Sequence, residues 1–335
     1  MRVASKKDVY YPWLIYFAVV FFSILLVRGC YKFEYIKEIS TELPTQPIPS
    51  SYLCNMNRSS GIGSTARDVV LLFGSHFAPG LQLCIKSLRS TGCKARIILF
   101  GGSSITSDQT ALNFFKLMNV ELIPNCDEPN KREYVPHMLR YEYELNWLLK
   151  NSGTIDRVLH TDSFDVFFQG DPFSEHVPHD SLKFVVEPHQ VRSCGWNYAW
   201  IYSCYGEEGL KKRLNNFIIC SGSISGGYLS YVALLKLMIS QKEWSTCYKA
   251  SEDQAILNYL VWNQDVRNAG IKYSFTGCDD GFFTVQWCAI EKKVKFNEYG
   301  QAITEANTVP SYIHQYNRIQ SFTDFLFQKC GVQQK

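Results

Sequence analysis

The sequence has few charged residues and no strong excess of either sign. Charged side chains make up 19% of its 335 residues, and 34 Lys and Arg against 31 Asp and Glu leave a formal net charge of +3. Proteins that bind nucleic acid usually carry a basic face or stripe, and none is visible here. Nucleic acid is therefore not an expected partner. The 46% of hydrophobic residues is enough for a sizeable core and excludes a disordered chain.

Several motifs of nucleotide-binding and metal-binding proteins are missing as well. The chain has no G-x-G-x-x-G, no P-loop, no C-x2-C pair and no internal repeat. Neither a dinucleotide-binding fold, a P-loop NTPase nor a structural zinc site is indicated. The 12 cysteines are instead scattered along the chain, which is typical of disulfides formed in an oxidising compartment. Eleven of them follow Cys30, so at least one has no partner within that group.

An uncharged apolar run occupies residues 9–27 and predicts a transmembrane helix of about 28 Å. A cleaved signal peptide or a buried core helix is the alternative, but no small-residue cleavage site follows the run. Basic residues flank both sides equally, so orientation rests on the cysteines and on the glycosylation sequon at Asn57. We expect a single-pass type II protein of the Golgi or endoplasmic reticulum membrane. Its parts would be a cytoplasmic tail (1–8), a signal-anchor (9–27), a lumenal stem (28–65) and a lumenal catalytic domain (66–335).

The first part of this domain alternates between two apolar patterns. Short β-rich runs predict strands at 68–73, 96–100 and 120–123. Helical spacing follows Leu81, and Ser107 or Asp108 can cap a second helix. The alternation predicts a parallel sheet, in which ligands bind beyond the carboxyl ends of the strands. The loops after Phe73 and Phe100 are therefore candidate parts of a site.

The second part is less regular. Helices are expected at 138–150, 228–240 and 253–262, and short strands at 155–160, 164–168, 184–186 and 217–220. Together the two parts predict an α/β fold with a mixed, mainly parallel sheet flanked by helices.

Two carboxylates follow the apolar strand expected at 155–160. Asp162 and Asp165 stand in the segment HTDSFD, and the turn GDPF comes shortly after them. Carboxylates beside apolar flanks are costly unless a cation or hydrogen bonds compensate them. Their oxygen atoms suit Mg2+ or Mn2+. The sequence therefore predicts a divalent metal site, with the alternative that Asp162 caps a turn and Asp165 faces water.

The segment from Asp162 to Phe173 resembles the D-x-D region of nucleotide-diphospho-sugar transferases of the GT-A fold, near the glycosyltransferase family-eight type. Other landmarks of that family occur in the same order. The segment 218–227 is similar to the N-S-G-x-x-x-G loop, and 251–260 to the helix that begins with D-Q. The segment 310–318 is similar to the late histidine segment, and 137–149 to the helix before the D-x-D strand.

The resemblance implies a metal-dependent transfer of a sugar from a nucleotide-diphosphate donor, with a UDP-sugar favoured. The acceptor would be a hydroxyl of a glycan, protein or lipid in the secretory pathway. By the same resemblance Mn2+ or Mg2+ is the cofactor, and each site residue has an implied role. These residues are Asp162, Asp165 and His314 as metal ligands, Asp253 and Gln254 as catalytic residues, and Arg140, Ser221, Gly222, Gly226 and Gly227 as donor-binding residues.

Simpler interpretations of the same residues remain open. Asp253 could cap its helix, Arg140 could pair with Glu144 one turn on, and the glycines could form an ordinary tight loop. The sequence also departs from the family pattern at Cys220, where relatives usually have Asn, and in the D-x-x-D spacing of its carboxylates. A catalytically inactive binding or scaffold protein is therefore an alternative. A metal-dependent phosphohydrolase is a second alternative, which predicts a denser set of metal ligands.

Overall fold

The computed structural model describes residues 47–59, 61–127, 135–174, 177–250, 252–289 and 293–334. The predicted tail, the predicted anchor at 9–27 and the first part of the predicted stem lie outside these residues. Within them, no helix has both the length and the apolar character needed to cross a membrane.

The alternating part of the sequence forms the parallel half of the central sheet. Strands β1 (Asp68–Gly74), β2 (Arg96–Gly101) and β3 (Val120–Ile123) pair side by side in parallel. Helix α2 (Pro79–Ser90) connects the first two strands, and α4 (Gln109–Leu117) precedes the third. The carboxylate of Asp108 accepts hydrogen bonds from two backbone N–H groups of α4, so the predicted cap is confirmed.

The complete sheet has seven strands in the order β3-β2-β1-β4-β7-β6-β8. The four further strands are β4 (Arg157–Thr161), β6 (Leu182–Gln190), β7 (Phe217–Gly227) and β8 (Tyr273–Thr276). Only β7 runs antiparallel to its neighbours β4 and β6, and the other pairs are parallel. The predicted mixed, mainly parallel sheet flanked by helices is confirmed.

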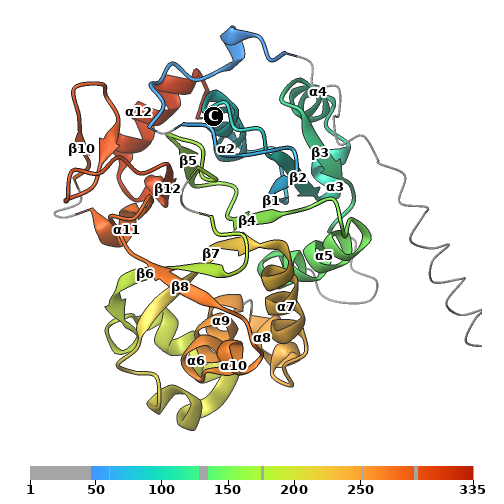
Figure 1. Cartoon of the computed structure of the whole chain (residues 1–335), viewed down its shortest axis with the longest axis vertical. Coiled ribbons are helices and arrows are strands. Elements are labelled where there is room, and N and C mark those ends of the chain that lie inside the picture. Colours follow the sequence, from blue (N-terminus) through green and yellow to red (C-terminus); the bar gives the residue numbers. More distant parts are fainter. Residues whose placement is uncertain are drawn as a thin grey trace, which may run out of the picture. The chain divides into compact units, whose positions relative to one another are not determined.

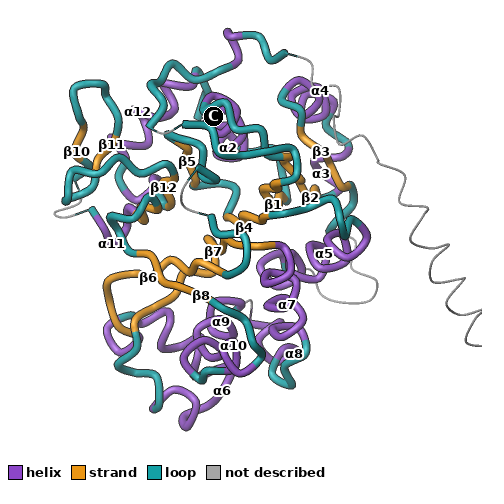
Figure 2. Tube along the Cα trace, viewed as in Figure 1, coloured by secondary structure: helices purple, strands orange, loops and turns teal. Residues whose placement is uncertain are grey.

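Helices cover both faces of this sheet (Figures 1 and 2). Successive residues of a strand point to opposite faces, so Val69 and Leu71 share a core with α5 (Pro136–Lys150), α7 (Tyr228–Ile239) and α9 (Asp253–Trp262). Val70 and Leu72 share the opposite core with α2 and α4. Burial on both faces explains why β1 is a continuous apolar run rather than an alternating one.

A small second sheet lies beside the end of β4. It contains β5 (Val166–Phe168), β12 (Tyr312–His314) and β9 (Phe282–Thr284) in the order β5-β12-β9. The remaining elements are the helices α3 (Ser103–Thr106), α6 (Gly195–Lys211), α8 (Trp244–Ala250), α10 (Asp265–Asn268), α11 (Val285–Cys288) and α12 (Gln320–Cys330), the strands β10 (Lys295–Phe296) and β11 (Ala302–Ile303), and the 3-10 turns η1 (Ser50–Tyr52), η2 (Val191–Ser193) and η4 (Tyr316–Arg318).

The part of the chain that the structure describes contains three disulfides and five free, buried cysteines. Cys54–Cys330 and Cys204–Cys247 connect segments far apart in the sequence, and Cys278–Cys288 closes a short loop. The predicted disulfides are thus present, and they fit an oxidising lumenal or secreted location.

The end of the predicted stem is part of the folded domain rather than an extended linker. Cys54 is bonded to the last helix, and Asp171 accepts hydrogen bonds from Gly63 N, Ser64 N and Ser64 Oγ at 3.0, 2.8 and 2.6 Å. Asp171 belongs to the GDPF turn, so in this molecule that turn holds the incoming segment in place. This segment lacks apolar periodicity, as a linker does, because polar contacts and a disulfide rather than apolar packing hold it in place.

Candidate functional site

Two aspartates and one histidine meet at the carboxyl end of β4. Asp162 and Asp165 follow this strand, and His314 ends β12. Each offers one ligand atom, and these atoms lie within 4.8 Å of one another. His314 Nε2 is 3.2 Å from Asp162 Oδ2 and 3.5 Å from Asp165 Oδ1. Two carboxylates and an imidazole at this spacing can hold a divalent metal ion, and they are the three side chains predicted as ligands.

Pairing between two short strands brings His314 to the carboxylates. β12 runs antiparallel to β5, and His314 lies opposite Val166. The backbone N–H of Gln315 then donates to the carbonyl oxygen of Asp165 at 2.8 Å. The third ligand is therefore positioned by a strand pair between segments that are far apart in the sequence.

Strand β7 passes directly beside the ligands at Gly222. The carbonyl of Gly222 accepts a hydrogen bond from Asp162 N at 3.0 Å. A Cβ atom on this residue would lie 2.2 Å from Asp162 Oδ2 and 2.9 Å from His314 Cε1. Such contacts are too short for any side chain. Glycine at this position is what allows the strand to lie against the two ligands.

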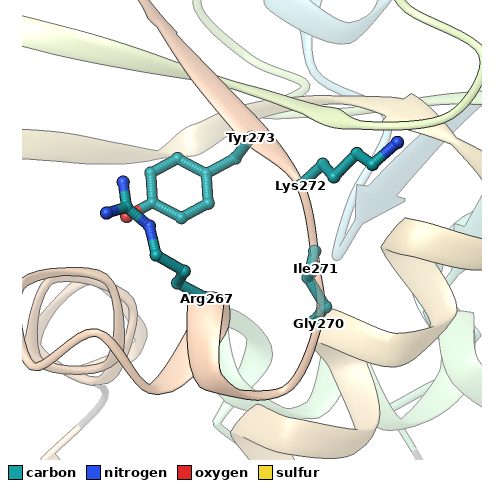
Figure 3. A pocket seen from close by; sticks show the side chains of 5 residues that line it. All are labelled: Arg267, Gly270, Ile271, Lys272 and Tyr273. Atoms are coloured by element: carbon teal, nitrogen blue, oxygen red, sulfur yellow. The ribbon is translucent and has the colours of Figure 1, made fainter.

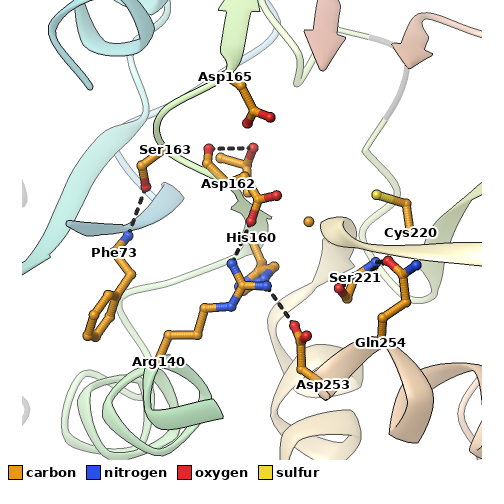
Figure 4. Close-up of polar contacts among 12 residues, drawn as sticks. Phe73, Arg140, His160, Asp162, Ser163, Asp165, Cys220, Ser221, Asp253 and Gln254 are labelled. Atoms are coloured by element: carbon orange, nitrogen blue, oxygen red, sulfur yellow. Dashed lines mark hydrogen bonds and ion pairs between the residues drawn. The ribbon is translucent and has the colours of Figure 1, made fainter. Parts of the chain in front are cut away.

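Arg140 of α5 joins the ligand cluster to Asp253 of α9 (Figure 4). Arg140 Nη1 donates to Asp162 Oδ1 at 2.6 Å, and Nη2 donates to Asp253 Oδ2 at 2.7 Å. The hydroxyl of Tyr141 donates to the same Asp253 oxygen at 2.8 Å. The helix before the D-x-x-D strand thus connects two predicted functional groups through one guanidinium.

The alternative pairing of Arg140 with Glu144 is wrong. Glu144 accepts hydrogen bonds from the hydroxyl of Tyr231 at 2.6 Å and from Nδ1 of His160 at 2.9 Å. His160 lies on β4 and points from the sheet towards α5. Side chains on one helix turn are neighbours, but here each has a better partner on another element.

The charges of the cluster stabilise one another. Burial disfavours the charged form of Asp162, but Arg140 and His314 outweigh it and hold the pKa of this carboxyl well below its usual range. Burial alone would lower the pKa of His314. The carboxylates of Asp162 and Asp165 outweigh that effect and raise this pKa well above its usual value. A metal ion bound to His314 would compete with the proton that these carboxylates favour.

Cys220 lies against the second nitrogen of the His314 ring. Its Sγ is 3.6 Å from His314 Nδ1, and burial raises the pKa of the thiol, which favours its neutral form. A metal-binding histidine usually places its other ring nitrogen against a hydrogen-bonding partner that fixes its orientation. The departure from the family pattern at Cys220 thus falls at a position behind a metal ligand.

A hollow of about 320 Å³ opens beside the ligands. It is bounded by the loop after β1, the start of α5 and the D-x-x-D segment, so the structure brings the loop after Phe73 to the candidate site. Its lining residues are Phe73, Ser75, Pro136, His137, Arg140, Asp162, Ser163, Phe164, Asp165 and Asn317. The hollow combines an apolar wall with one cation and two carboxylates, which suits a ligand with a flat ring and a charged group.

Asp253 and Gln254 begin α9 and point to different partners. Glu252 occupies the N-cap and makes no side-chain hydrogen bond of the capping kind, while the Asp253 carboxylate binds Arg140. Gln254 Oε1 accepts from the backbone N–H of Ser221 at 2.9 Å, and Gln254 Nε2 donates to Asn197 Oδ1 at 2.9 Å. The structure therefore brings Asp253, Gln254 and Ser221 to the same end of the sheet as the ligand cluster.

Gly226 and Gly227 lie elsewhere. The predicted loop at 218–227 is strand β7, in which these glycines pair with Val158 and Arg157 at the start of β4. A Cβ on Gly227 would lie 1.8 Å from the carbonyl oxygen of His179. The two glycines serve close backbone packing at the far end of β4 from Asp162, and the structure does not bring them to the site.

A second hollow of about 280 Å³ lies at the connection between α10 and β8 (Figure 3). It is lined by Arg267, Gly270, Ile271, Lys272 and Tyr273. Arg267 lies over the ring of Tyr273, 5.7 Å from its centroid. This hollow contains none of the predicted site residues and no carboxylate, so we assign it no part in the candidate site.

Sequence reasoning missed several residues of the site. Tyr141 binds Asp253 directly, Asn197 binds Gln254, and Asn317 lines the hollow. Asn317 had a usable signal, since it stands three residues after the predicted ligand His314. Tyr141 had a similar signal, since it directly follows the predicted residue Arg140. Asn197 had none, because its partner Gln254 lies on an element that is distant in the sequence.

The sequence matches no protein-family model, and a search of curated proteins also returned no match. The functional argument therefore rests on the geometry of the site and on the motif resemblance.

Proposed function

We propose that this protein is a metal-dependent glycosyltransferase of the GT-A type that uses a nucleotide-diphosphate sugar. One observation carries the proposal: Asp162, Asp165 and His314 lie within 4.8 Å of one another beside a hollow that also contains Arg140. A divalent cation held there, Mn2+ or Mg2+, would offset the charge of a diphosphate as the nucleotide leaves. The D-x-x-D segment and the late histidine occur in the order that the resemblance implies.

The chain's own side chains suggest a division of roles. The hollow at Phe73 and His137 would take the nucleotide, with its diphosphate towards Asp162 and Asp165. Arg140 is already held by two carboxylates in the buried part of the site, and its guanidinium can donate to a phosphate oxygen in fixed geometry.

Asp253 and Gln254 would face the sugar on the other side of Arg140. Transfer breaks the bond between the anomeric carbon and the diphosphate oxygen and forms a bond from that carbon to an acceptor hydroxyl. Positive charge grows on the sugar ring during this exchange. The carboxylate of Asp253 can stabilise that charge electrostatically, and the amide of Gln254, fixed by Ser221 and Asn197, can orient the sugar hydroxyls.

The proposed setting is the lumen of the Golgi or endoplasmic reticulum. Three disulfides are consistent with an oxidising compartment, and the apolar run at 9–27 would anchor the chain as a type II membrane protein. The acceptor would be a glycan, protein or lipid of the secretory pathway.

The proposal can be tested by nucleotide release. The full-length chain in detergent would be incubated with Mn2+ and a panel of nucleotide sugars, UDP-sugars first, and free nucleotide would be measured. We expect release that depends on Mn2+ and that falls about a hundredfold or more in Asp165→Asn, because one ligand oxygen loses its charge. Asp180→Asn is the matched control, since Asp180 is 77% exposed and lies outside the cluster.

Each alternative predicts a different result of the same experiment. Release of inorganic phosphate in place of nucleotide would indicate a phosphohydrolase. Mn2+ binding without release from any donor, measured by calorimetry on the folded protein, would indicate a binding or scaffold protein. Equal nucleotide release from wild type and Asp165→Asn would contradict the role of the cluster.

A further inference from the structure

Helix α6 exposes an unusual concentration of aromatic side chains. Trp196, Tyr198 and Tyr202 are 74%, 45% and 53% exposed. Among the described residues, no other helix exposes more than one large hydrophobic side chain. Trp196 lies on one side of the helix and Tyr198 and Tyr202 on another, because residues two apart point in nearly opposite directions. Large aromatic surfaces in water are unfavourable unless a ligand or partner covers them, so the side with Trp196 is a candidate binding surface.

The helix is fixed to the predicted catalytic residues at several points. Asn197, next to Trp196, accepts the hydrogen bond from Gln254 Nε2 at 2.9 Å. Ser203 donates to the carboxylate of Glu252, the residue before Asp253. The Cys204–Cys247 disulfide adds a covalent connection to α8, which precedes that segment.

The buried side of α6 contains Asn197, Ile201 and Cys204. Trp196 lies on the neighbouring flank together with Ser203, seven residues on, which contacts Glu252. Trp200 lies between them, and its ring centroid is 6.3 Å from that of Trp196. The two tryptophans form a pair of adjacent rings, and Asn197 beside Trp196 binds Gln254.

The position of the hollow leaves this side for the acceptor. In Figure 4, Phe73 and Ser163 lie on one side of Arg140 and Asp162, while Ser221 and Gln254 lie on the other. A nucleotide in the hollow would occupy the first side. An acceptor has to reach the sugar from another direction, and the second side continues through Asn197 to Trp196.

The chemistry of the surface selects the kind of ligand. From Gly195 to Gly206 the helix has no charged residue, and its charged residues Glu207, Glu208 and Lys211 all follow Gly206. An anionic ligand at Trp196 would therefore find no cation on this part of the helix. The C–H groups on the face of a sugar ring, in contrast, pack well against the electron-rich face of an indole.

We propose that Trp196, supported by Trp200, forms a subsite for a neutral glycan acceptor. The inference rests on the proposed function, because it names the acceptor of the same reaction. It is also independent in one respect, since glycan binding can be measured without turnover.

The test is a glycan array probed with the full-length chain in detergent, followed by calorimetric titration of a bound neutral oligosaccharide. We expect binding by wild type and a loss of about tenfold or more in Trp196→Ala, as is usual when an exposed tryptophan at the centre of a contact is removed. Trp196→Phe keeps a ring and should lose less. Tyr299→Ala, which removes a 60% exposed aromatic elsewhere, should bind as wild type does.

Three outcomes would overturn the subsite: no neutral glycan bound by wild type, equal affinity in Trp196→Ala, or a preference for sulfated or sialylated glycans. Unfolding midpoints of all variants check that each protein is folded. Nucleotide release by the same wild-type preparation separates the two proposals. Release without glycan binding would reject the subsite alone, and glycan binding without release would reject the transferase alone.

Discussion

Two polar clusters lie one turn apart on α5 and differ in their access to solvent. The open cluster consists of Arg140, Asp162, Asp165, Asp253 and His314. It borders the hollow, and the side chain of Asp162 keeps a third of its surface exposed, 33%. The closed cluster consists of Glu144, His160 and Tyr231, which are 1%, 0% and 0% exposed. The same helix therefore contributes one side chain to a site that is open to solvent and another to a core that is closed to it.

The difference lies in how each charge is compensated. In the closed cluster the Glu144 oxygens receive their hydrogen bonds from inside the core. In the open cluster Asp162 and Asp165 share His314, while Arg140 pairs with Asp162 and Asp253, which leaves room for a further cation. Breaking the closed cluster should therefore cost stability, whereas changing the open cluster should mainly alter binding.

The largest effect is expected for Glu144→Ala. The change removes the acceptor of two buried donors, His160 Nδ1 and Tyr231 OH, in a space that water does not reach. Leaving such groups unpaired should lower the free energy of unfolding by about 3–5 kcal/mol. Chemical denaturation of the purified protein measures this loss.

Two other variants serve as controls for the stability of Glu144→Ala. Glu144→Gln keeps an oxygen acceptor and should lose clearly less than the alanine variant. Glu207→Ala removes an exposed carboxylate paired with Lys211 on the surface and should change stability little. If Glu144→Ala were as stable as Glu207→Ala, the closed cluster would not have the structural role assigned to it.

A smaller effect, dependent on pH, is expected at Glu187. This carboxyl is 3% exposed, and burial raises its pKa to about 7, although His314 opposes that effect. The folded protein then keeps a proton between pH 4.5 and 7 that the unfolded chain releases. The contribution of Glu187 to the free energy of unfolding is therefore fully present below pH 4.5. It is lost as the pH rises towards 7, and the free energy of unfolding falls by about 3 kcal/mol in total.

Denaturation of wild type and Glu187→Gln at pH 5 and pH 7.5 tests this sign. The variant cannot titrate, so it should gain stability relative to wild type at the higher pH. All other groups titrate in both proteins, and the difference isolates Glu187. Parallel pH profiles would show that Glu187 is as ionised in the folded protein as in the unfolded one.

The sequence predicts the open cluster better than the closed one, for a physical reason. Asp162 and Asp165 follow an apolar run, and a strand that ends in carboxylates is visible as a local pattern. The partners of Arg140 and Glu144 depend instead on which side chains of β4, α7 and α9 reach α5. Helical spacing suggested that Arg140 and Glu144 pair with each other. In the structure each pairs instead with side chains of other elements.

The same limit explains the errors in the second half of the chain. The stretch 218–227 contains three glycines and resembles a loop, but strand pairing on both sides makes it β7. Helix α6 was not predicted, because its aromatic residues face solvent and core alike and Gly206 interrupts its helical backbone at φ 66°. Where an element is a nearly continuous apolar run, as in β1 and α9, its bounds were predicted within a residue or two.

The smallest effect, and the most direct test of the open cluster, concerns Arg140. Its Nη1 is 2.6 Å from Asp162 Oδ1, so a metal ion at Asp162 has a cation for a neighbour. Arg140→Leu removes that repulsion and should tighten Mn2+ binding about tenfold, while nucleotide release falls because the phosphate contact is lost. Arg140→Lys keeps the charge and should bind Mn2+ nearly as wild type does, and Arg67→Leu, at the exposed pair with Asp156, should leave Mn2+ affinity unchanged. Calorimetric titration with Mn2+ distinguishes these cases. Weaker binding in Arg140→Leu would mean that Arg140 holds Asp162 in place for the metal, and the open cluster would then depend on its internal pairs as the closed one does.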